Sequence, residues 1–308
     1  MHAEEIYLPE QLPVLPIGTQ GSAINTRKIE ASGIVWNPEE KHYLLVSDEQ
    51  YKDKPGVFIL DSDGSITAQL EMKKDLVVDD LESISTDGKY FYILSSLSRN
   101  KNDDLKSKRK KFIRFKYKNK KVKKQKEIDL YAVLKNIRDQ QSSGDVAAFL
   151  TKAIADHSMD IESHFVAGNA LYIGFKSPST GYFNTVIIKI NNLDSLFSGE
   201  IPKAEVWETI ELLDSEIGEP MKLTDMIRIN NKLFLLSVSR SAVKKSTLWC
   251  YQLEDKVLTE VQKFPGLKAE GVAYRSEKSL LTVVFDEGRH TRSKYSSFLF
   301  RTHSLDEE

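Results

Sequence analysis

One short pattern occurs five times in this sequence: a serine or a carboxylate, then one small or apolar residue, then in four copies an Ile or Val that continues a predicted strand. A second apolar stretch of strand length follows each copy. Repetition of an all-strand unit at this scale is typical of a β-propeller, in which each unit forms one blade. The pattern also places one polar residue of every blade at the same structural position. The five copies are Ala31–Ile34, Leu81–Ile84, Ile161–His164, Thr224–Ile227 and Ala269–Val272.

Alternating hydrophobicity and turn residues predict four strands in each of the first four units and three in the last. A propeller that lacks its final strand can take one from the other end of the chain. We expect Glu4–Leu8 or Ala23–Ile29 to supply that strand. The predicted fold is therefore all-β: a five-bladed β-propeller closed by an N-terminal strand, in one domain over residues 1–308, with six blades as the alternative.

The intervals between the successive polar positions are 50, 80, 63 and 45 residues, so the second interval contains an insertion. Within residues 129–156 the apolar residues recur with a helical period, which Ser142-Ser143-Gly144 interrupts. The sequence therefore predicts a helical hairpin between blades 2 and 3. Because this hairpin joins an outer strand to the next inner strand, we expect it at the end of the channel where the inner strands begin.

The composition limits the class of protein. The chain has 308 residues, a formal net charge of -1 and one cysteine, Cys250, so it contains no internal disulfide. The first residues lack the apolar stretch of a signal peptide, and no apolar run is as long as a membrane span. We therefore expect a cytoplasmic protein without a membrane partner; a secreted protein whose signal had been removed would look the same.

The polar position of each blade lies at the start of the innermost strand, so the five residues are expected to form a ring at one mouth of the central channel. Four carboxylates in one channel mouth repel each other unless a positive charge compensates them. A divalent cation, most simply Ca²⁺, accepts irregular groups of oxygen ligands. The alternative is a structural role in which each residue caps backbone groups at a corner. The predicted ring residues, which are also the predicted metal ligands, are Ser32, Glu82, Glu162, Asp225 and Glu270.

Cationic residues follow the second strand of three blades, at Arg99, Lys176 and Arg240. Neighbouring strands are antiparallel, so these loops return to the same mouth as the ring. Cationic groups beside a metal site are the arrangement that binds phosphate esters and stabilises their reaction. The alternative for each is an ordinary solvated loop charge. Further cationic candidates in the last such loop are Arg289, His290 and Arg292.

His164 occupies a place where the other four blades have Ile or Val. It lies two residues beyond Glu162 and is expected on the same face of the strand. Histidine is the usual general acid or base near neutral pH, so His164 is a candidate for that role or for a ligand. The alternative is a hydrogen-bonded histidine of the core.

The segment Lys106–Lys126 contains many lysines and no acidic residue. Such a segment could hold a nucleic acid through phosphate contacts. The lysines alternate with apolar residues, as expected for a solvated outer hairpin, and lysines on an edge strand also prevent aggregation. We therefore regard a nucleic-acid partner as disfavoured.

The repeated Glu-Ser and Glu-Gly pairs before a strand, together with Tyr-Leu-Leu-Val-Ser-Asp at 43–48, resemble the phytase-like and esterase-like bacterial β-propellers. The five-blade count and the ring are also similar to the calcium-activated nucleotidases, the apyrases. The resemblance covers residues 30–287 and implies a central Ca²⁺ held by the ring, with hydrolysis of nucleoside diphosphates at the channel mouth. Under it Ser32, Glu82, Glu162 and Glu270 would be metal ligands, and Asp225 would match the fourth blade's position.

Two functions from different classes are consistent with these patterns. The first is a metal-dependent hydrolase of a nucleotide or another small phosphorylated molecule, with Arg99, Lys176 and Arg240 holding the phosphate and His164 as acid or base. The alternative is a non-catalytic propeller that binds a small anionic ligand or a protein partner at the same mouth.

Overall fold

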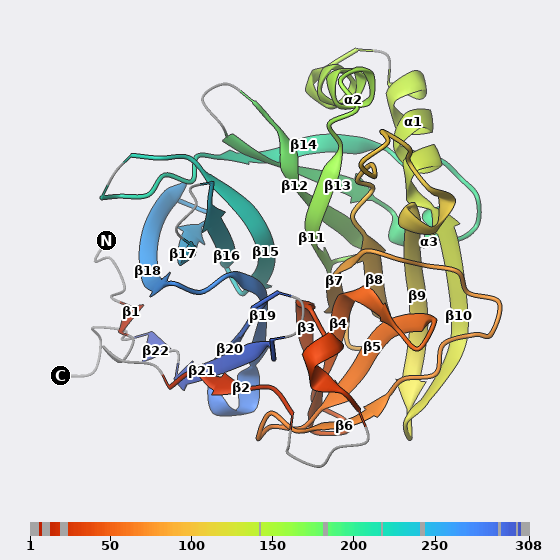
Figure 1. The fold of residues 1–308 in the computed structure, drawn as a ribbon. Helices are drawn as coiled ribbons and strands as arrows, with labels where there is room; N and C mark the ends of the chain where they lie inside the picture. The colour runs from red at the N-terminus through yellow and green to blue at the C-terminus, as the bar shows by residue number, and fades with distance from the viewer. Residues whose placement is uncertain are drawn as a thin grey trace.

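The computed structural model describes residues 6–7, 13–18, 24–141, 143–180, 184–216, 218–240, 244–288, 291–299 and 301–302. Five antiparallel sheets of four strands stand in a ring (Figure 1). The innermost strands β3, β7, β11, β15 and β19 contact each other in this order, and β19 contacts β3. The prediction of a five-bladed propeller is therefore confirmed.

The strands of the first four blades follow the chain from the inside of the ring to the outside. Blade 1 consists of β3 (Ala31–Asn37), β4 (His42–Tyr51), β5 (Lys54–Leu60) and β6 (Ile66–Gln69). Blade 2 consists of β7 (Leu81–Thr86), β8 (Phe91–Ser95), β9 (Lys111–Lys118) and β10 (Lys121–Asp129). Blade 3 consists of β11 (Asp160–Ala167), β12 (Ala170–Thr180), β13 (Asn184–Asn191) and β14 (Ala204–Ile210). Blade 4 consists of β15 (Met221–Ile229), β16 (Lys232–Ser239), β17 (Lys245–Gln252) and β18 (Val257–Pro265).

Blade 5 combines both ends of the chain. Its inner strands are β19 (Ala269–Arg275), β20 (Leu280–Phe285) and β21 (Lys294–Leu299), and its outer strand is β2 (Leu15–Pro16). The ring is thus closed by an N-terminal strand, as predicted, but from neither of the two expected segments. Strand β1 (Ile6–Tyr7) pairs instead with β22 (Arg301–Thr302) in a separate two-stranded sheet.

The second expected closing segment, Ala23–Ile29, is not a strand where the structure describes it. Thr26–Lys28 form a 3-10 helix that starts where the Asn25 side chain accepts a hydrogen bond from the backbone N–H of Arg27. Asparagine favours this local bond over a sheet ladder, which explains why the segment turns.

The cores lie between the blades, because each strand turns alternate side chains toward its two neighbouring blades. In β4, Leu44 and Val46 pack with apolar residues of blade 2, whereas Tyr43 and Leu45 pack with residues of blade 5. The four side chains are almost completely buried. Burial on both faces explains why these strands are continuous apolar runs in the sequence.

The predicted helical hairpin is present as α1 (Leu130–Gln140) and α2 (Asp145–Ala155), at the top of Figure 1 beside blade 3. The Asp129 side chain caps α1 by accepting a hydrogen bond from the N–H of Ala132, at 2.8 Å. The buried residues of both helices belong to the core between blades 2 and 3, and the rings of Phe149 and Phe175 meet edge to face. The hairpin is therefore packed as part of the fold.

Short helical segments complete the described elements: the helix α3 (Leu193–Leu196), and the 3-10 turns at Ser107–Arg109 and Ser276–Lys278. None of the helices in the described part of the chain has the length and apolar character needed to cross a bilayer.

Candidate functional site

Each of the five inner strands has a β-bulge near its start. In β7, Leu81 pairs with Ser95 and Ser83 pairs with Leu94, so Glu82 is the extra residue. A bulge releases one residue from the ladder and redirects its side chain. The same register shift occurs in all five blades, and the extra residues are Ser32, Glu82, Glu162, Thr224 and Glu270.

This register changes the expected ring at one position. In blade 4, Leu223 and Asp225 pair with consecutive residues of β16, so Thr224 occupies the bulge and Asp225 lies one place beyond it. Asp225 is therefore equivalent to Ser83. The hydrogen bonds agree: the Asp225 carboxylate accepts from the N–H of Val272 in blade 5 at 2.8 Å, and the Ser83 hydroxyl accepts from the N–H of His164 in blade 3 at 3.1 Å.

The bulge residues of blades 1 and 4 carry hydroxyl groups that join neighbouring blades. The Ser32 hydroxyl donates to the carbonyl oxygen of Leu81 in blade 2. The Thr224 hydroxyl donates to the carbonyl oxygen of Ala269 in blade 5, at 2.7 Å. These two positions are structural ties between inner strands, so the carboxyl groups of the ring come from Glu82, Glu162 and Glu270.

Two further layers of side chains, all but one of them polar, surround this ring. One consists of the residues two positions before each bulge. The other consists of the residue that follows, on each second strand, the partner of the residue before the bulge. Together with the ring they contribute eight carboxyl groups and three lysines. The first layer is Glu30, Asp80, Asp160, Lys222 and Lys268, and the second is Asp48, Ser96, Lys176, Val238 and Asp286.

Lysines compensate two of the three ring glutamates. The Lys176 ammonium lies 2.7 Å from the Glu162 carboxylate, and the Lys268 ammonium lies 2.6 Å from Glu270 and 3.0 Å from Asp286. Glu162 and Glu270 are only 4% and 3% exposed, so burial raises their pKa values and the lysines oppose that rise. The charge repulsion expected of the ring is thus reduced by the protein's own ammonium groups.

Glu82 differs from the other two glutamates. It is partly exposed, and its side chain makes no hydrogen bond or ion pair with any residue that the structure describes. Burial, and then the charges of Glu162, Asp80 and Asp48, raise its pKa well above the ordinary value. A raised pKa favours the protonated form of this carboxyl group, which can donate a proton.

Besides Glu162 of blade 3, the carboxyl groups that act on Glu82 are Asp80 of blade 2 and Asp48 of blade 1. Asp80 is compensated, because it accepts from the hydroxyls of Ser96 and Ser98 and lies 3.0 Å from the guanidinium of Arg109. Asp48 has a buried oxygen without a hydrogen-bond partner among the described residues. Burial, and then the neighbouring acidic groups, raise the pKa of Asp48 to about 8.

The cationic groups gather on the other side of the mouth, in blades 3 and 4. Burial lowers the pKa of Lys222, and the positive charges of Lys176 and Arg240 lower it further. Lys176, Lys222 and Arg240 therefore lie close enough to repel one another. An anionic ligand placed among them would relieve this repulsion. The mouth is thus acidic on the side of blades 1 and 2, whereas on the side of blades 3 and 4 the cations lie among the carboxyl groups of Asp160 and Glu162, which raise the pKa of Lys222.

The described side chains do not form a ready coordination site for the divalent cation expected at the ring. Among the residues that the structure describes, no three His, Cys, Asp or Glu side chains are grouped so that they could hold a metal ion. Calcium takes six to eight oxygen ligands, and here Lys176 and Lys268 occupy carboxylates of the ring. As the side chains stand, the donor set does not fit a metal held by the protein alone.

The structure separates the remaining candidates from the mouth. The bulge at Glu162 breaks the alternation, so His164 turns toward blade 2, where its ring meets Phe112 edge to face at 5.6 Å. His164 is 1% exposed, and burial lowers its pKa to about 3, so it stays neutral. Arg99 is held within its own loop, where it donates to the carbonyl oxygen of Asp103.

The last loop contributes little to the described site. Arg292 is partly buried, and Arg289 and His290 lie outside the described residues. Sequence reasoning did not select Lys222 or Asp48 as site residues. Both could have been found by position: Lys222 stands two residues before a bulge, and Asp48 directly follows Ser47, the partner of Ala31.

Below the ring, neighbouring inner strands approach each other very closely. A Cβ atom added at Gly33 would lie 3.0 Å from the carbonyl oxygen of Glu82, and one at Gly271 would lie 2.9 Å from the Cα of Gly33. Only glycine allows backbones to approach in this way. The carboxyl group of Asp225, 3% exposed, lies at the same level. We call this level, formed by Gly33, Ser83, Ser163, Asp225 and Gly271, the waist of the channel.

Comparisons with known proteins show likeness of fold alone. No protein-family model matches the sequence, and no curated protein matches it. A bifunctional GH43-CE protein from Bacteroides eggerthii superposes with a TM-score of 0.51 and 10% identity, over 92% of this chain and 34% of that chain. A GH43 protein from Bacillus licheniformis gives 0.49 and 11%, over 97% and 57%. The WD40 repeats of RRP9 give 0.48 and 8%, over 96% and 100%.

Proposed function

We propose that the channel mouth binds a small phosphorylated or similarly anionic molecule and hydrolyses it. The observation that supports this most is the cluster of Lys176, Lys222 and Arg240, in which burial and then the two neighbouring positive charges lower the pKa of Lys222. A protein keeps cations together at a partly buried site against repulsion when an anion binds among them. The anionic group of the ligand would occupy this side of the mouth.

Glu82 is the group we propose for the chemistry. Its pKa is raised well above the ordinary value, which favours the protonated form, and it lies beside the cation cluster, since Lys176 is among the charges that act on it. Water would add to the phosphorus or carbonyl centre, the bond to the leaving oxygen would break, and Glu82 would give its proton to that oxygen. The proton lost by the added water would then return to the Glu82 carboxylate. Glu162, held by Lys176, would keep the ammonium group in place.

Binding is tested first, without reference to turnover. Inorganic phosphate, pyrophosphate, nucleotides and sugar phosphates are titrated against the protein, and the melting temperature and the pKa of Lys222, measured by NMR of dimethylated lysines, are recorded. We expect a bound anion to raise both, and Lys222→Gln to weaken binding about tenfold. The matched control is Lys278→Gln, an exposed lysine at the turn between β19 and β20. If none of these anions changes either quantity, the proposal fails.

Hydrolysis is tested with the same compounds by release of phosphate. We expect Glu82→Gln to lower kcat by at least about a hundredfold while binding is retained, because the amide has no proton to give. Binding without turnover of any compound would leave the alternative of a non-catalytic propeller that binds a small anionic ligand at this mouth.

A divalent cation is the second candidate ligand of the mouth. The acidic side favours it, since Glu82 has no ion pair and Asp48 has an oxygen without a hydrogen-bond partner in the described chain. Water and side-chain rotation would have to complete the shell. Calcium in millimolar concentration should then raise the melting temperature relative to chelator, and Glu82→Gln but not the exposed Glu71→Gln should remove the difference. Identical melting of the wild type in calcium and in chelator would exclude this cation.

A further inference from the structure

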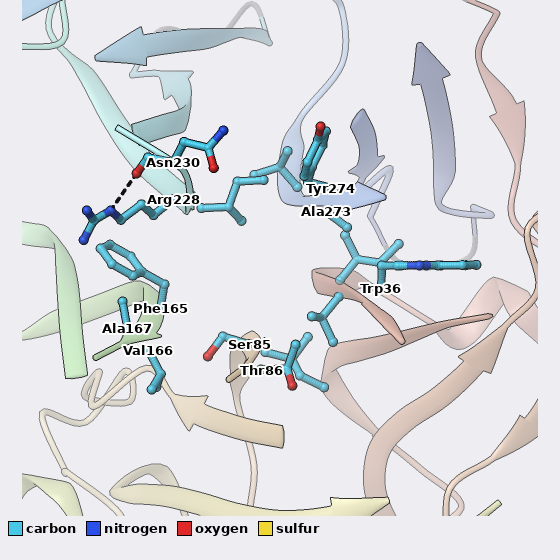
Figure 2. A pocket seen from close by; sticks show the side chains of 15 residues that line it. Trp36, Ser85, Thr86, Phe165, Val166, Ala167, Arg228, Asn230, Ala273 and Tyr274 are labelled. Carbon is cyan, nitrogen blue, oxygen red and sulfur yellow. Dashed lines mark hydrogen bonds between the residues drawn. The ribbon is translucent and has the colours of Figure 1, made fainter. Parts of the chain in front are cut away.

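A second cavity lies at the opposite end of the channel from the polar ring. It has a volume of about 350 Å³, and all five inner strands contribute to its wall (Figure 2). The residues that line it are mainly apolar and include Val35, Val166 and Ala167. A cavity of this size and lining is within the range of small-molecule sites. We call it the lower pocket.

The waist separates the lower pocket from the polar mouth. Gly33 and Gly271 bring neighbouring backbones together, and the Asp225 carboxylate is bonded to the backbone of blade 5. Neither Glu82 nor Lys176 is among the residues that line the lower pocket, and no residue of the polar ring is. The lower pocket is therefore a site distinct from the mouth.

The only charged side chain among the fifteen residues that line the lower pocket is Arg228. It is exposed, its Nε donates to the carbonyl oxygen of Asn230 at 3.0 Å, and no carboxylate in the described chain pairs with it (Figure 2). Its terminal amino groups are thus available to an anion at the rim. The hydroxyl of Ser85 also lines the pocket, is buried, and has no hydrogen-bond partner among the described residues.

We propose that the lower pocket is a second ligand site, for a small amphipathic acid. Its apolar body would lie against the five inner strands, and its carboxylate would pair with the guanidinium of Arg228 at the rim. The chemistry of the wall is complementary to this class of molecule: apolar surface, one positive charge and no negative charge. A cationic ligand finds no partner there, and a highly charged one cannot be desolvated by an apolar wall.

Decanoate is the probe, with decanol as its neutral analogue and decylamine as its cationic analogue, and binding is measured by equilibrium dialysis. We expect saturable binding of one decanoate per chain, weakened about tenfold in Arg228→Gln, since a charge-assisted hydrogen bond contributes this much. Decanol should bind the wild type and Arg228→Gln equally. Arg27→Gln, an exposed arginine outside the pocket, is the matched control and should bind as the wild type does.

A second variant tests the location independently of charge. Ala167→Phe fills the pocket from the end of β11 and should abolish binding of both decanoate and decanol, while its melting temperature verifies that it folds. Lys222→Gln, at the opposite mouth, should leave decanoate binding unchanged and so distinguishes this site from the proposed function. Absence of saturable binding, or equal binding of decanoate by wild type, Arg228→Gln and a folded Ala167→Phe, would overturn the proposal. Binding of a protein segment in place of the acid would do so as well.

Discussion

The ion pair between Lys176 and Glu162 joins a loop residue to a buried carboxylate of the inner strand, and its removal is a direct test of the mouth. Replacing Lys176 by Met leaves the Glu162 charge uncompensated, so the free energy of unfolding at pH 8 should fall by about 3 kcal/mol. Urea denaturation measures this change in the free energy of unfolding. The double variant with Glu162→Gln should recover most of the loss, and the loss should shrink as the pH falls, because burial raises the pKa of Glu162 and protonation removes its charge. An equal loss with and without Glu162→Gln would contradict this account.

Asp48 makes stability depend on pH in a defined direction. Its pKa is about 8 in the folded protein against 3.8 for an unperturbed aspartate, so between these values the folded state holds a proton that the unfolded state has lost. Raising the pH through this window therefore lowers the free energy of unfolding, by up to about 1.4 kcal/mol per pH unit for one proton. Asp48→Asn should reduce the slope, whereas the exposed Asp75→Asn should not. Urea unfolding curves at several pH values give the slope for the wild type and for both variants.

At the residue scale, the sequence located the ring glutamates and placed Lys176 at the same mouth, but it did not predict that Lys176 and Lys268 compensate the ring charges. Glu82, Glu162 and Glu270 share a local pattern that can be read directly. Lys268 is marked in the sequence only by its position two residues before a ring residue. Lys222 has the same position in blade 4, but the sequence pattern places the ring residue of that blade at Asp225 and therefore points to Leu223 instead. Compensation depends on which loops converge in space, which a local pattern does not specify.

At the scale of elements, the bulges explain both the success and the error of the sequence analysis. Alternation finds a strand wherever apolar residues recur, but it does not show which residue the ladder leaves out. In blade 4 an acidic residue directly follows the bulge. The sequence pattern therefore predicts Asp225 at the ring position, which Thr224 occupies in the structure. The same bulge in blade 3 turns His164 away from the mouth.

The close approach of inner strands at the waist gives a prediction for Gly33. Its added Cβ would meet the backbone of blade 2 at 3.0 Å, and backbone cannot move aside as a side chain can. Gly33→Ala should therefore lower the free energy of unfolding by about 2 kcal/mol, measured by urea denaturation. Ala31→Gly, on the same strand but before the bulge, is the comparison and should cost less, about 1 kcal/mol. A Gly33→Ala variant as stable as the wild type would show that the inner strands are not in such tight contact.

At the scale of the whole molecule, the ring is held closed by a very short strand. β2 has only two residues and pairs with β21 through Leu15 and Pro16. The next residue, Ile17, strengthens this closure, since its N–H donates to the carbonyl oxygen of Ser293 at 2.8 Å and its side chain is 1% exposed. A segment this short and rich in proline gives almost no strand signal, which is why the sequence predicted closure but not the residues that perform it.

Closure by β2 leads to a test on the complete fold. Removing residues 1–18 would leave the outer edge of β21 unpaired and would open the core that Ile17 shares with Tyr295 and Ala273, between blades 5 and 1. We expect a melting temperature lower by about 10 °C and self-association at high concentration, because an open edge pairs with other chains. Removing residues 1–12 should have a much smaller effect, since β2 remains. Calorimetry and light scattering on the two truncated proteins compare them directly, and equal stability of both would show that blade 5 holds the ring without its fourth strand.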